Sequence, residues 1–371
     1  MPSWWWLLIE VLVKVVLVLV PLLTVAALLT WDERKQSALM QDRLGPNRAN
    51  IGPFTLWGLI HPIADTLKLF FKEDIVPDRA DKLLHALAPI LALAPSLIVY
   101  CVIPFGPAVQ IPGIGRPIAL QVADLDAGLL FIFAISSLAV FGVALAGWAS
   151  NNKFSLLGAL RASAQMFSYE IVLGLAAVGV IVVFGSVRMS ELVARQATPL
   201  WGGLPSWGIL VQPLGFVLFM VAALAELKRS PFDVPEGESE IVAGFWTEYS
   251  GMRWGMFYVA EFVEVSVLSG LLVALFFGGY HIPGVDPGWA LTGHTVAIPF
   301  TSHGLAIAGW GWGLLMMLAF GLKVIVGDVV LQQIRWTFPR FRYDQVMSLG
   351  WKMLLPLALL NVLVTGAIVI R

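Results

Sequence analysis

This chain has few charged residues for its length. Of its 371 residues, 13% are charged and 58% are hydrophobic, and the mean hydropathy is +0.84. A soluble core of this size would not need so much apolar surface, so the composition excludes a soluble globular protein and indicates an integral membrane protein. The formal net charge of −1 gives no electrostatic support for binding to nucleic acid.

Cysteine is almost absent, since Cys101 stands alone in an apolar run. One thiol excludes an internal disulfide and an ordinary four-thiolate iron–sulfur cluster held by this chain alone. No G-x-G-x-x-G follows a strand and no P-loop lysine motif occurs, so flavin, nicotinamide and ATP have no recognisable site. The five histidines show no metal-ligand spacing. We therefore expect that this chain alone binds no metal and no cofactor. These histidines are His61, His85, His281, His294 and His303.

Long apolar runs are abundant instead, and they predict an all-α polytopic membrane protein rather than a barrel, whose strands would alternate. Residues 54–73 are apolar but are interrupted by proline and charge, which favours an interfacial amphipathic helix, with a ninth crossing as the alternative. No repeat or compositional break divides the chain, so we expect one integral membrane domain over 1–371. About eight transmembrane helices are expected, at 7–29, 83–105, 127–149, 163–185, 207–227, 255–278, 305–327 and 351–370.

Lysine and arginine are distributed unevenly between the two sets of loops. The loops at 31–82, 150–162, 228–254 and 328–352 carry 17 of the 23 basic residues. Positively charged loops are retained in the cytoplasm, so both termini are expected outside. The long cytoplasmic loops are then 31–82, which holds the interfacial helix, and 228–254, which is acidic.

Several carboxylates lie inside the predicted spans, where an ionised acid costs at least about 2.5–3.5 kcal/mol unless it is neutral, paired or hydrated. Glu170 and Glu261 have no cation nearby in the sequence, which favours a buried polar pathway. Glu264 follows Glu261 by three residues and shares its helix face. Glu226 precedes Lys228 and Arg229, so a simple ion pair at the membrane boundary is an equal alternative.

Two lysines also lie within predicted spans. Glu10 and Lys14 are four residues apart and are expected to neutralise one another at the membrane edge. Lys323 is a candidate counter-charge for one of the intramembrane acids.

The loop at 228–254 concentrates acids between prolines and aromatic residues. A solvated charge run is the usual explanation of such clustering. Here Pro231, Pro235 and Gly237 punctuate the acids, and Phe232 and Trp246 flank them, so we expect a shaped loop against the membrane. The acids are Asp233, Glu236, Glu238, Glu240 and Glu248.

Three segments give the chain a specific family resemblance. It resembles the H subunit of proton-translocating NADH:quinone oxidoreductase, the bacterial respiratory complex I, over essentially its whole length. In the second of these segments His61 stands where the family usually has Gln, and the outer loop at 279–304 is longer than the family leads us to expect. The segments are Glu33 to Arg48, Gly58 to Leu69 and Ser230 to Gly244.

The resemblance implies a membrane subunit that is not catalytic alone. Electrons would pass from NADH through FMN and iron–sulfur clusters in partner subunits to a quinone at the junction with this chain. The expected quinone is ubiquinone. The implied partners are the cytoplasmic iron–sulfur arm, the small neighbouring membrane subunits and the lipid of the bacterial inner membrane. The implied quinone-chamber residues are Arg34, Asp65, Phe232, Glu236, Glu238 and Glu240, and the implied proton pathway consists of Glu170, Glu226 and Glu261.

Three other functions stay open at this point. A self-sufficient proton-coupled transporter would also carry intramembrane acids and a broken helix. The related membrane subunit of energy-converting hydrogenases is a nearer alternative, which quinone dependence would decide. A passive scaffold would use the same acids only to hold helices together.

Overall fold

A computed structural model describes residues 4–113, 116–200, 204–235, 237–297 and 304–370. Helices dominate this part of the chain, and seven of them are long and apolar enough to cross a membrane. The all-α polytopic prediction is therefore confirmed. The seven are α1 (Trp4–Met40), α3 (Lys82–Tyr100), the consecutive α4 (Gly128–Ser136) and α5 (Leu138–Ala149), α6 (Lys153–Phe184), α11 (Gly251–Phe276), α13 (Gly309–Thr337), and α14 (Tyr343–Ser348) running through the π-helical η4 (Leu349–Leu354) into α15 (Leu355–Val369).

The eighth expected span is a shorter helix, α9 (Pro213–Glu226), preceded by a single turn, α8 (Gly208–Val211). Gln212 leaves the helical conformation between them, at φ −130° and ψ 59°. Pro213 explains the break, because proline has no N–H to continue the ladder and restricts the residue before it.

Several predicted boundaries are wrong. Helix α1 runs to Met40, well beyond residue 29, because residues 30–40 contain no proline or glycine and continue the helix. Helix α13 begins at Gly309 rather than at 305, since the residues before it pair as a strand. Helix α6 begins ten residues earlier than expected, at Lys153, where the Asn152 side chain accepts from the Phe154 N–H as an N-cap.

Residues 54–73 form a short 3₁₀ turn, η1 (Leu56–Gly58), and the helix α2 (His61–Phe71). Eleven residues span only about 16 Å, too short to cross a bilayer. The ninth-crossing alternative is therefore excluded. Ile63, Leu67 and Phe70 lie exposed at helical spacing, as expected of an amphipathic helix that lies along an apolar surface.

Short elements connect the spans. The described residues form two antiparallel strand pairs, β1 (Ala108–Val109) with β2 (Ile118–Ala119), and β3 (His294–Ala297) with β4 (Gly304–Ile307). In the second pair His294 lies opposite Ile307. The remaining short helices are α7 (Met189–Arg195), α10 (Glu238–Ile241), η3 (Gly244–Trp246) and α12 (Trp289–Thr292).

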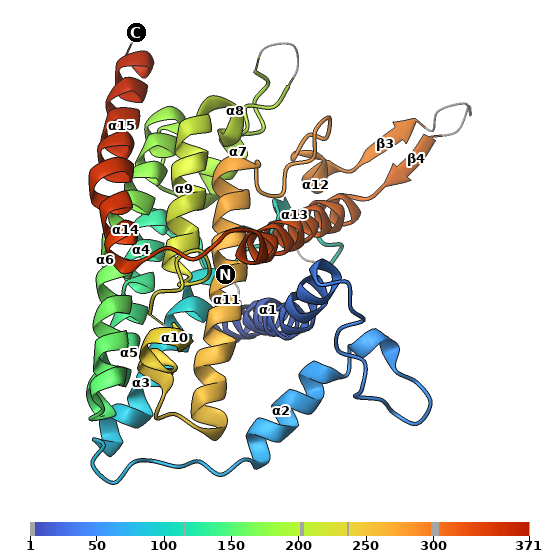
Figure 1. The fold of residues 1–371 in the computed structure, drawn as a ribbon. Helices are drawn as coiled ribbons and strands as arrows, with labels where there is room; N and C mark the ends of the chain where they lie inside the picture. Colours follow the sequence, from blue (N-terminus) through green and yellow to red (C-terminus); the bar gives the residue numbers. More distant parts are fainter. Residues whose placement is uncertain (1–3, 114–115, 201–203, 236, 298–303, 371) are drawn as a thin grey trace.

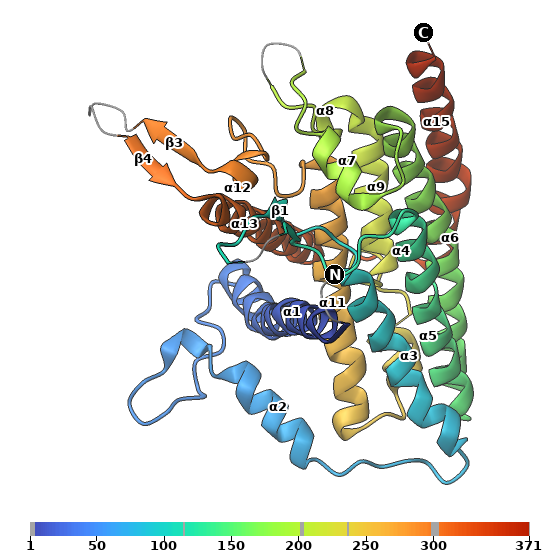
Figure 2. The ribbon, with the colours of Figure 1, turned by 180° about the vertical axis from the view of Figure 1, so that it is seen from behind.

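Helices α3, α5, α6, α9, α11 and α15 run roughly alongside one another, whereas α1 and α13 are strongly inclined to them and are seen almost end-on (Figures 1 and 2). Helix α11 is the most buried of the spanning helices. It contacts α1, α3, α9 and α13, so it is the axis about which the interior is arranged.

Helices α1, α13 and α15 keep mostly exposed apolar surfaces. In a membrane protein these surfaces face lipid or neighbouring chains, so the polar groups of functional interest are those turned inward.

Candidate functional site

A cavity of about 50 Å³ lies among α3, α4, α5, α6, α9 and α11. Three carboxylates line it, Glu170 from α6, Glu226 from the end of α9 and Glu264 from α11. Its other walls are mostly apolar, with hydroxyls from Ser96 and Ser136. A cavity of this size can hold a few water molecules, since one water needs roughly 10–15 Å³ measured in this way. The arrangement is suited to moving protons between acids inside the bundle.

The two cations that follow Glu226 in the sequence both pair with acids of α11. Among the described ion pairs, Lys228 Nζ lies 3.4 Å from Glu264 and Arg229 Nε lies 2.6 Å from Glu261. The Oε2 atom of Glu226 is buried and has no hydrogen-bond partner among the described residues. The boundary ion pair stays a prediction, since the charge of Lys228 acts on Glu226, and the carboxyls of Glu170 and Glu264 face Glu226 as well.

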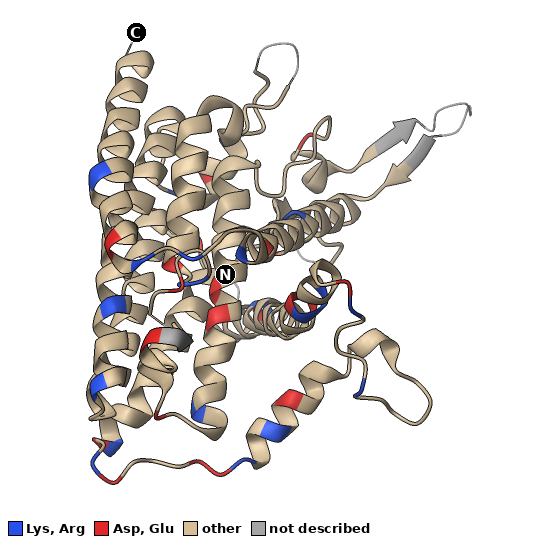
Figure 3. Ribbon diagram, viewed as in Figure 1, with Lys and Arg blue, Asp and Glu red and all other residues tan. Residues whose placement is uncertain are grey.

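Beside the cavity is a row of buried ion pairs that we call the ion-pair array, made of Arg335, Glu33, Arg229 and Glu261 in that order. The successive distances are 2.9 Å, 3.4 Å and 2.6 Å, measured from guanidinium nitrogen to carboxylate oxygen. Acidic positions on α11 and basic positions of the neighbouring segments meet in the middle of the molecule (Figure 3). Buried pairs of this kind are coupled, because removing one charge strands its neighbours.

Arg229 is the centre of this array. Its side chain is 3% exposed, and its guanidinium lies 4.3 Å from the centre of the Phe262 ring. Burial alone would lower the pKa of Arg229, but the carboxylates of Glu261 and Glu33 outweigh burial and raise it. Arg229 is therefore a fixed positive charge between two acids.

The two acids on α11 have different surroundings, although sequence reasoning treated them as one pair. Glu264 lines the cavity, whereas Glu261 belongs to the ion-pair array. That Glu261 lies on a buried polar path stays a prediction, and its counter-charge comes from a residue 32 positions away. Only the fold brings Arg229 to it.

Arg34 and Asp65, two of the residues implied for the quinone chamber, form an ion pair of 2.6 Å. The pair joins α1 to α2, and its side chains are 37% and 39% exposed. On the same side, Trp31 Nε1 donates to the carbonyl oxygen of Trp57 at 3.0 Å, and His61 Nε2 accepts from the Ala49 N–H at 3.3 Å. The first bond ties η1 to α1 and the second ties the start of α2 to the preceding loop, so that only the Arg34–Asp65 pair joins α1 and α2 directly among these contacts.

The acidic loop is held against the bundle by buried contacts. Phe232 is 3% exposed, and its ring lies 5.6 Å from those of Tyr169 and Phe341. Gln165 Nε2 donates to the carbonyl oxygens of Ala225 at 2.8 Å and Phe232 at 2.9 Å. The sequence therefore correctly indicates a shaped loop, although the Phe232 ring lies in the core.

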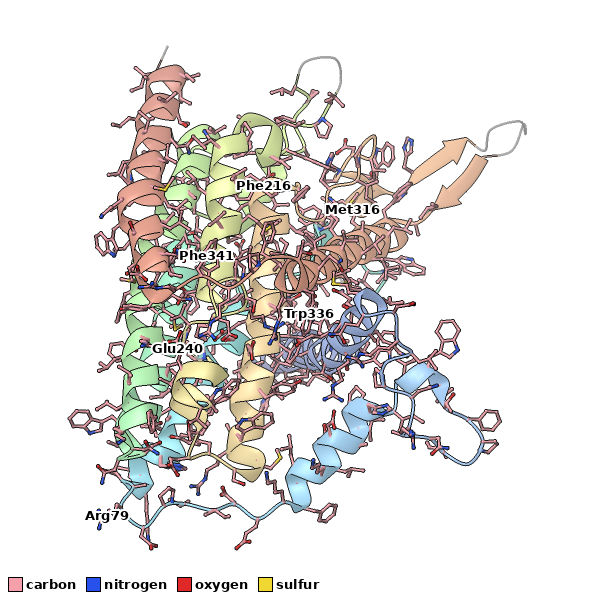
Figure 4. The ribbon with its side chains drawn as sticks, viewed as in Figure 1. Arg79, Phe216, Glu240, Met316, Trp336 and Phe341 are labelled. Carbon is pink, nitrogen blue, oxygen red and sulfur yellow. The ribbon has the colours of Figure 1, made fainter. Side chains whose placement is uncertain are left out.

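The structure does not describe all three of the loop glutamates that were implied for the quinone chamber. Glu240, on α10, is exposed and forms an ion pair of 2.7 Å with Arg161 of α6 (Figure 4). Glu236 and the side chain of Glu238 lie outside the described residues.

Lys323 is not the counter-charge of an intramembrane acid. Its Nζ donates to three backbone carbonyl oxygens, of Phe277 at 2.8 Å, Gly279 at 3.0 Å and His281 at 2.7 Å. These carbonyls follow the end of α11, where the helix leaves acceptors unpaired and a cation is favoured. The counter-charge hypothesis is therefore wrong, and Lys323 caps α11.

The Glu10–Lys14 pair is confirmed, with 2.8 Å between Oε1 and Nζ, and Arg116 also bonds to Glu10. Within the described ranges of the chain, no group of three His, Cys, Asp or Glu side chains is placed to hold a metal ion.

Fold and site together define a polytopic membrane protein with ionisable groups assembled inside its helix bundle. The chain belongs to the NADH dehydrogenase family, because the family model of that description matches residues 13–366.

Relatives match it over nearly the full length. The NADH-quinone oxidoreductase H subunit 1 of Geobacter metallireducens is 46% identical over 355 residues, which is 96% of this chain and 95% of that protein. The NADH-quinone oxidoreductase H subunit of Thermomicrobium roseum is 45% identical, covering 99% of this chain and 97% of its own. The corresponding H subunit 1 of Cytophaga hutchinsonii is 44% identical, covering 94% and 93%. The resemblance drawn from three sequence segments is confirmed.

Proposed function

We propose that this chain is the membrane subunit of a proton-pumping NADH:quinone oxidoreductase that forms the membrane part of the quinone chamber and couples quinone reduction to proton translocation. Family membership and full-length relatives named as H subunits of NADH-quinone oxidoreductase support the first part. The ion-pair array and the carboxylate-lined cavity support the second. With one cysteine, the chain relies on partner subunits for FMN and iron–sulfur clusters.

The quinone chamber lies, in this proposal, beside the Arg34–Asp65 ion pair and the acidic loop that carries Glu236, Glu238 and Glu240. A quinone headgroup that is being reduced needs two protons and polar partners, which half-exposed charged groups supply. Phe232 anchors the loop to the helix bundle through its contacts with Tyr169 and Phe341.

Coupling begins when quinone reduction changes the charge next to the ion-pair array. Glu33 is adjacent in sequence to Arg34, so such a change acts on Arg229 and Glu261 at short range. Two unit charges about 4 Å apart interact by about 4 kcal/mol at an effective dielectric constant of 20. Lys228 carries the effect to Glu264, and the cavity passes it to Glu226 and Glu170.

The carboxylate-lined cavity is the observation that carries the proposal. Its test is Glu226→Gln, measured as NADH:quinone reductase activity and proton pumping in membranes, with assembly followed by native gel and by NADH oxidation with an artificial acceptor. We expect assembly and acceptor activity to persist while pumping falls. Glu191→Gln, in the outer helix α7 and 46% exposed, is the matched control.

The three alternative functions predict different results in this experiment and in two further measurements. Intact pumping in Glu226→Gln would contradict the coupling role and favour a scaffold. Substrate transport by the purified chain alone would favour a self-sufficient transporter. Activity that does not depend on quinone would favour the membrane subunit of a hydrogenase.

Location and orientation belong to the same proposal. The whole chain is taken as one domain of the bacterial inner membrane, with the basic loops and the acidic loop facing the cytoplasm and the iron–sulfur arm. The small neighbouring membrane subunits and lipid cover the exposed faces of α1, α13 and α15.

A further inference from the structure

A second group of buried polar side chains lies on the other side of α11, between α11, α1 and α13. We call it the polar seam. It is separate from the carboxylate-lined cavity, because none of its residues lines that cavity. The polar seam consists of Asp32 and Gln36 on α1, Ser266 and Ser269 on α11, and Asp328 and Gln332 on α13.

Hydrogen bonds across the polar seam join the three helices. Gln36 Nε2 donates to Asp32 Oδ2 at 2.7 Å and to the Val329 carbonyl oxygen, on α13, at 3.4 Å. In return, Gln332 Nε2 donates to the Leu29 carbonyl oxygen, on α1, at 3.2 Å. Ser266 Oγ donates to Asp328 Oδ2 at 3.1 Å. Both side-chain amides of the polar seam thus use their donors to hold the helices together.

Two acceptor oxygens of the polar seam are not used in this way. Gln332 Oε1 and Gln36 Oε1 have no hydrogen-bond partner among the described residues, although Gln332 is 0% exposed and Gln36 is 7% exposed. Asp328, also 0% exposed, is approached by the hydroxyls of Ser266 and Ser269. An unsatisfied buried polar group costs about 1–3 kcal/mol, so such groups are rarely left without a donor. The two amide oxygens need a donor, which a water molecule supplies.

Asp328 also has no ion-pair partner among the described residues. The charged groups that face it are Arg229, from the connection after α9, and Asp32, from α1, and neither is within ion-pair distance. Tyr100 faces it from α3. An ionised acid in this position would be uncompensated, which is the most costly state for a carboxyl inside a membrane.

A group of aromatic rings lies toward the outer end of the polar seam. Phe105 lies 5.4 Å from Tyr100 and 5.7 Å from Phe320, between ring centres. Phe320 precedes Asp328 by eight residues, about 12 Å along α13. At the opposite end Asp32 is adjacent in sequence to Glu33 of the ion-pair array. The charged groups that act on Asp328, Arg229 and Asp32, therefore lie toward the array.

We propose that Asp328 is a proton-loading site that exchanges protons with the ion-pair array through water held in the polar seam. This inference rests on the proposed coupling function and adds a branch to it. Loading forms an O–H bond on the Asp328 carboxylate and breaks one on a hydrated proton, with no change of oxidation state. In this proposal the Asp328 carboxyl holds one proton near the array and does not release it toward the outer side of the membrane.

The test is Asp328→Asn in the assembled complex. Redox-induced infrared difference spectra should lose a carboxylic-acid carbonyl band, and fewer protons should be pumped per quinone reduced, while artificial-acceptor oxidation is unchanged. Asp126→Asn, at a residue whose side chain is 96% exposed on an outer loop, is the matched control and should keep the band. Gln332→Leu, which keeps the acid but removes an acceptor, should shift the band and lower the same ratio.

Two results would overturn this inference. One is an unchanged band and pumping ratio in Asp328→Asn. The other is a band or ratio that depends on sodium ions, because the oxygens of the polar seam would then hold a metal cation. Failure of the wider function would appear differently, as intact pumping in Glu226→Gln.

Discussion

Replacing Arg229 alone should destabilise the assembled complex more than replacing Arg229 and Glu261 together. Arg229→Met removes the guanidinium that lies 2.6 Å from Glu261 and 3.4 Å from Glu33. Both carboxylates then remain in a buried site without the charge between them. The double variant Arg229→Met with Glu261→Gln removes one of these acids, and Arg335 still pairs with Glu33 at 2.9 Å.

The magnitude follows from burial. Removing one partner of a buried ion pair costs about 3–5 kcal/mol, because the remaining charge is uncompensated. The double variant loses a pair rather than stranding a charge, so its cost should be about 1–2 kcal/mol, similar to that of one lost hydrogen bond. As a control, Arg188→Met breaks a solvent-exposed pair with Asp124, and exposed pairs contribute little to stability, so its cost should be much smaller.

Large complexes unfold irreversibly, so the quantity to measure is the half-life of the purified complex at a fixed elevated temperature. Native gels of freshly prepared membranes show how much complex assembles before heating. We expect the half-life to be shortest for Arg229→Met, longer for the double variant and close to wild type for Arg188→Met. A double variant that inactivates as fast as Arg229→Met, or faster, would refute the reasoning that an uncompensated carboxylate causes the loss.

Two further predictions concern the outer end of α11. Lys323→Met should shorten the same half-life by the equivalent of about 1–3 kcal/mol, because three carbonyl acceptors lose their donor; an unchanged half-life would show that water replaces the ammonium. His281 is a pH probe, since burial and the neighbouring Lys323 lower its pKa below 6.5. The unfolded chain then binds the proton more readily, so stability is full above pH 6.5 and falls as the pH drops through the lowered pKa. His281→Gln should flatten that part of the half-life profile against pH, and a profile identical to wild type would contradict the assignment.

The sequence was sufficient for the class of fold, because about 20 apolar residues in a row have few structural alternatives. It failed at helix ends. Residues 30–40 read as a loop because they are charged, yet they continue α1 and place Glu33 and Arg34 on a rigid helix. A charged residue is expected to be exposed only when it has no partner of opposite charge. Here distant segments supply such partners, Arg229 for Glu33 and Asp65 for Arg34.

The candidate site was predictable residue by residue but not as an arrangement. Glu170, Glu226 and Glu261 stand out because acids are rare in apolar runs. Their partners do not, since Arg229 is 32 positions from Glu261. Lys323 is a second example. A lone cation in a span predicted a carboxylate partner, but its partners are backbone carbonyl oxygens beyond the end of a helix, which no sequence pattern reveals.

Helix α11 explains why three polar regions can respond together. At 3.6 residues per turn, Glu264 projects about 60° to one side of Glu261, and Ser269 and Ser266 project about 80° and 140° to the other. These directions correspond to the carboxylate-lined cavity, the ion-pair array and the polar seam. Because α11 is buried on nearly all sides, it cannot turn or shift for one region without moving the other two. A charge change at Arg229 should therefore alter pumping through both the cavity and the seam, and Glu226→Gln and Asp328→Asn should combine less than additively in their effects on protons pumped per quinone.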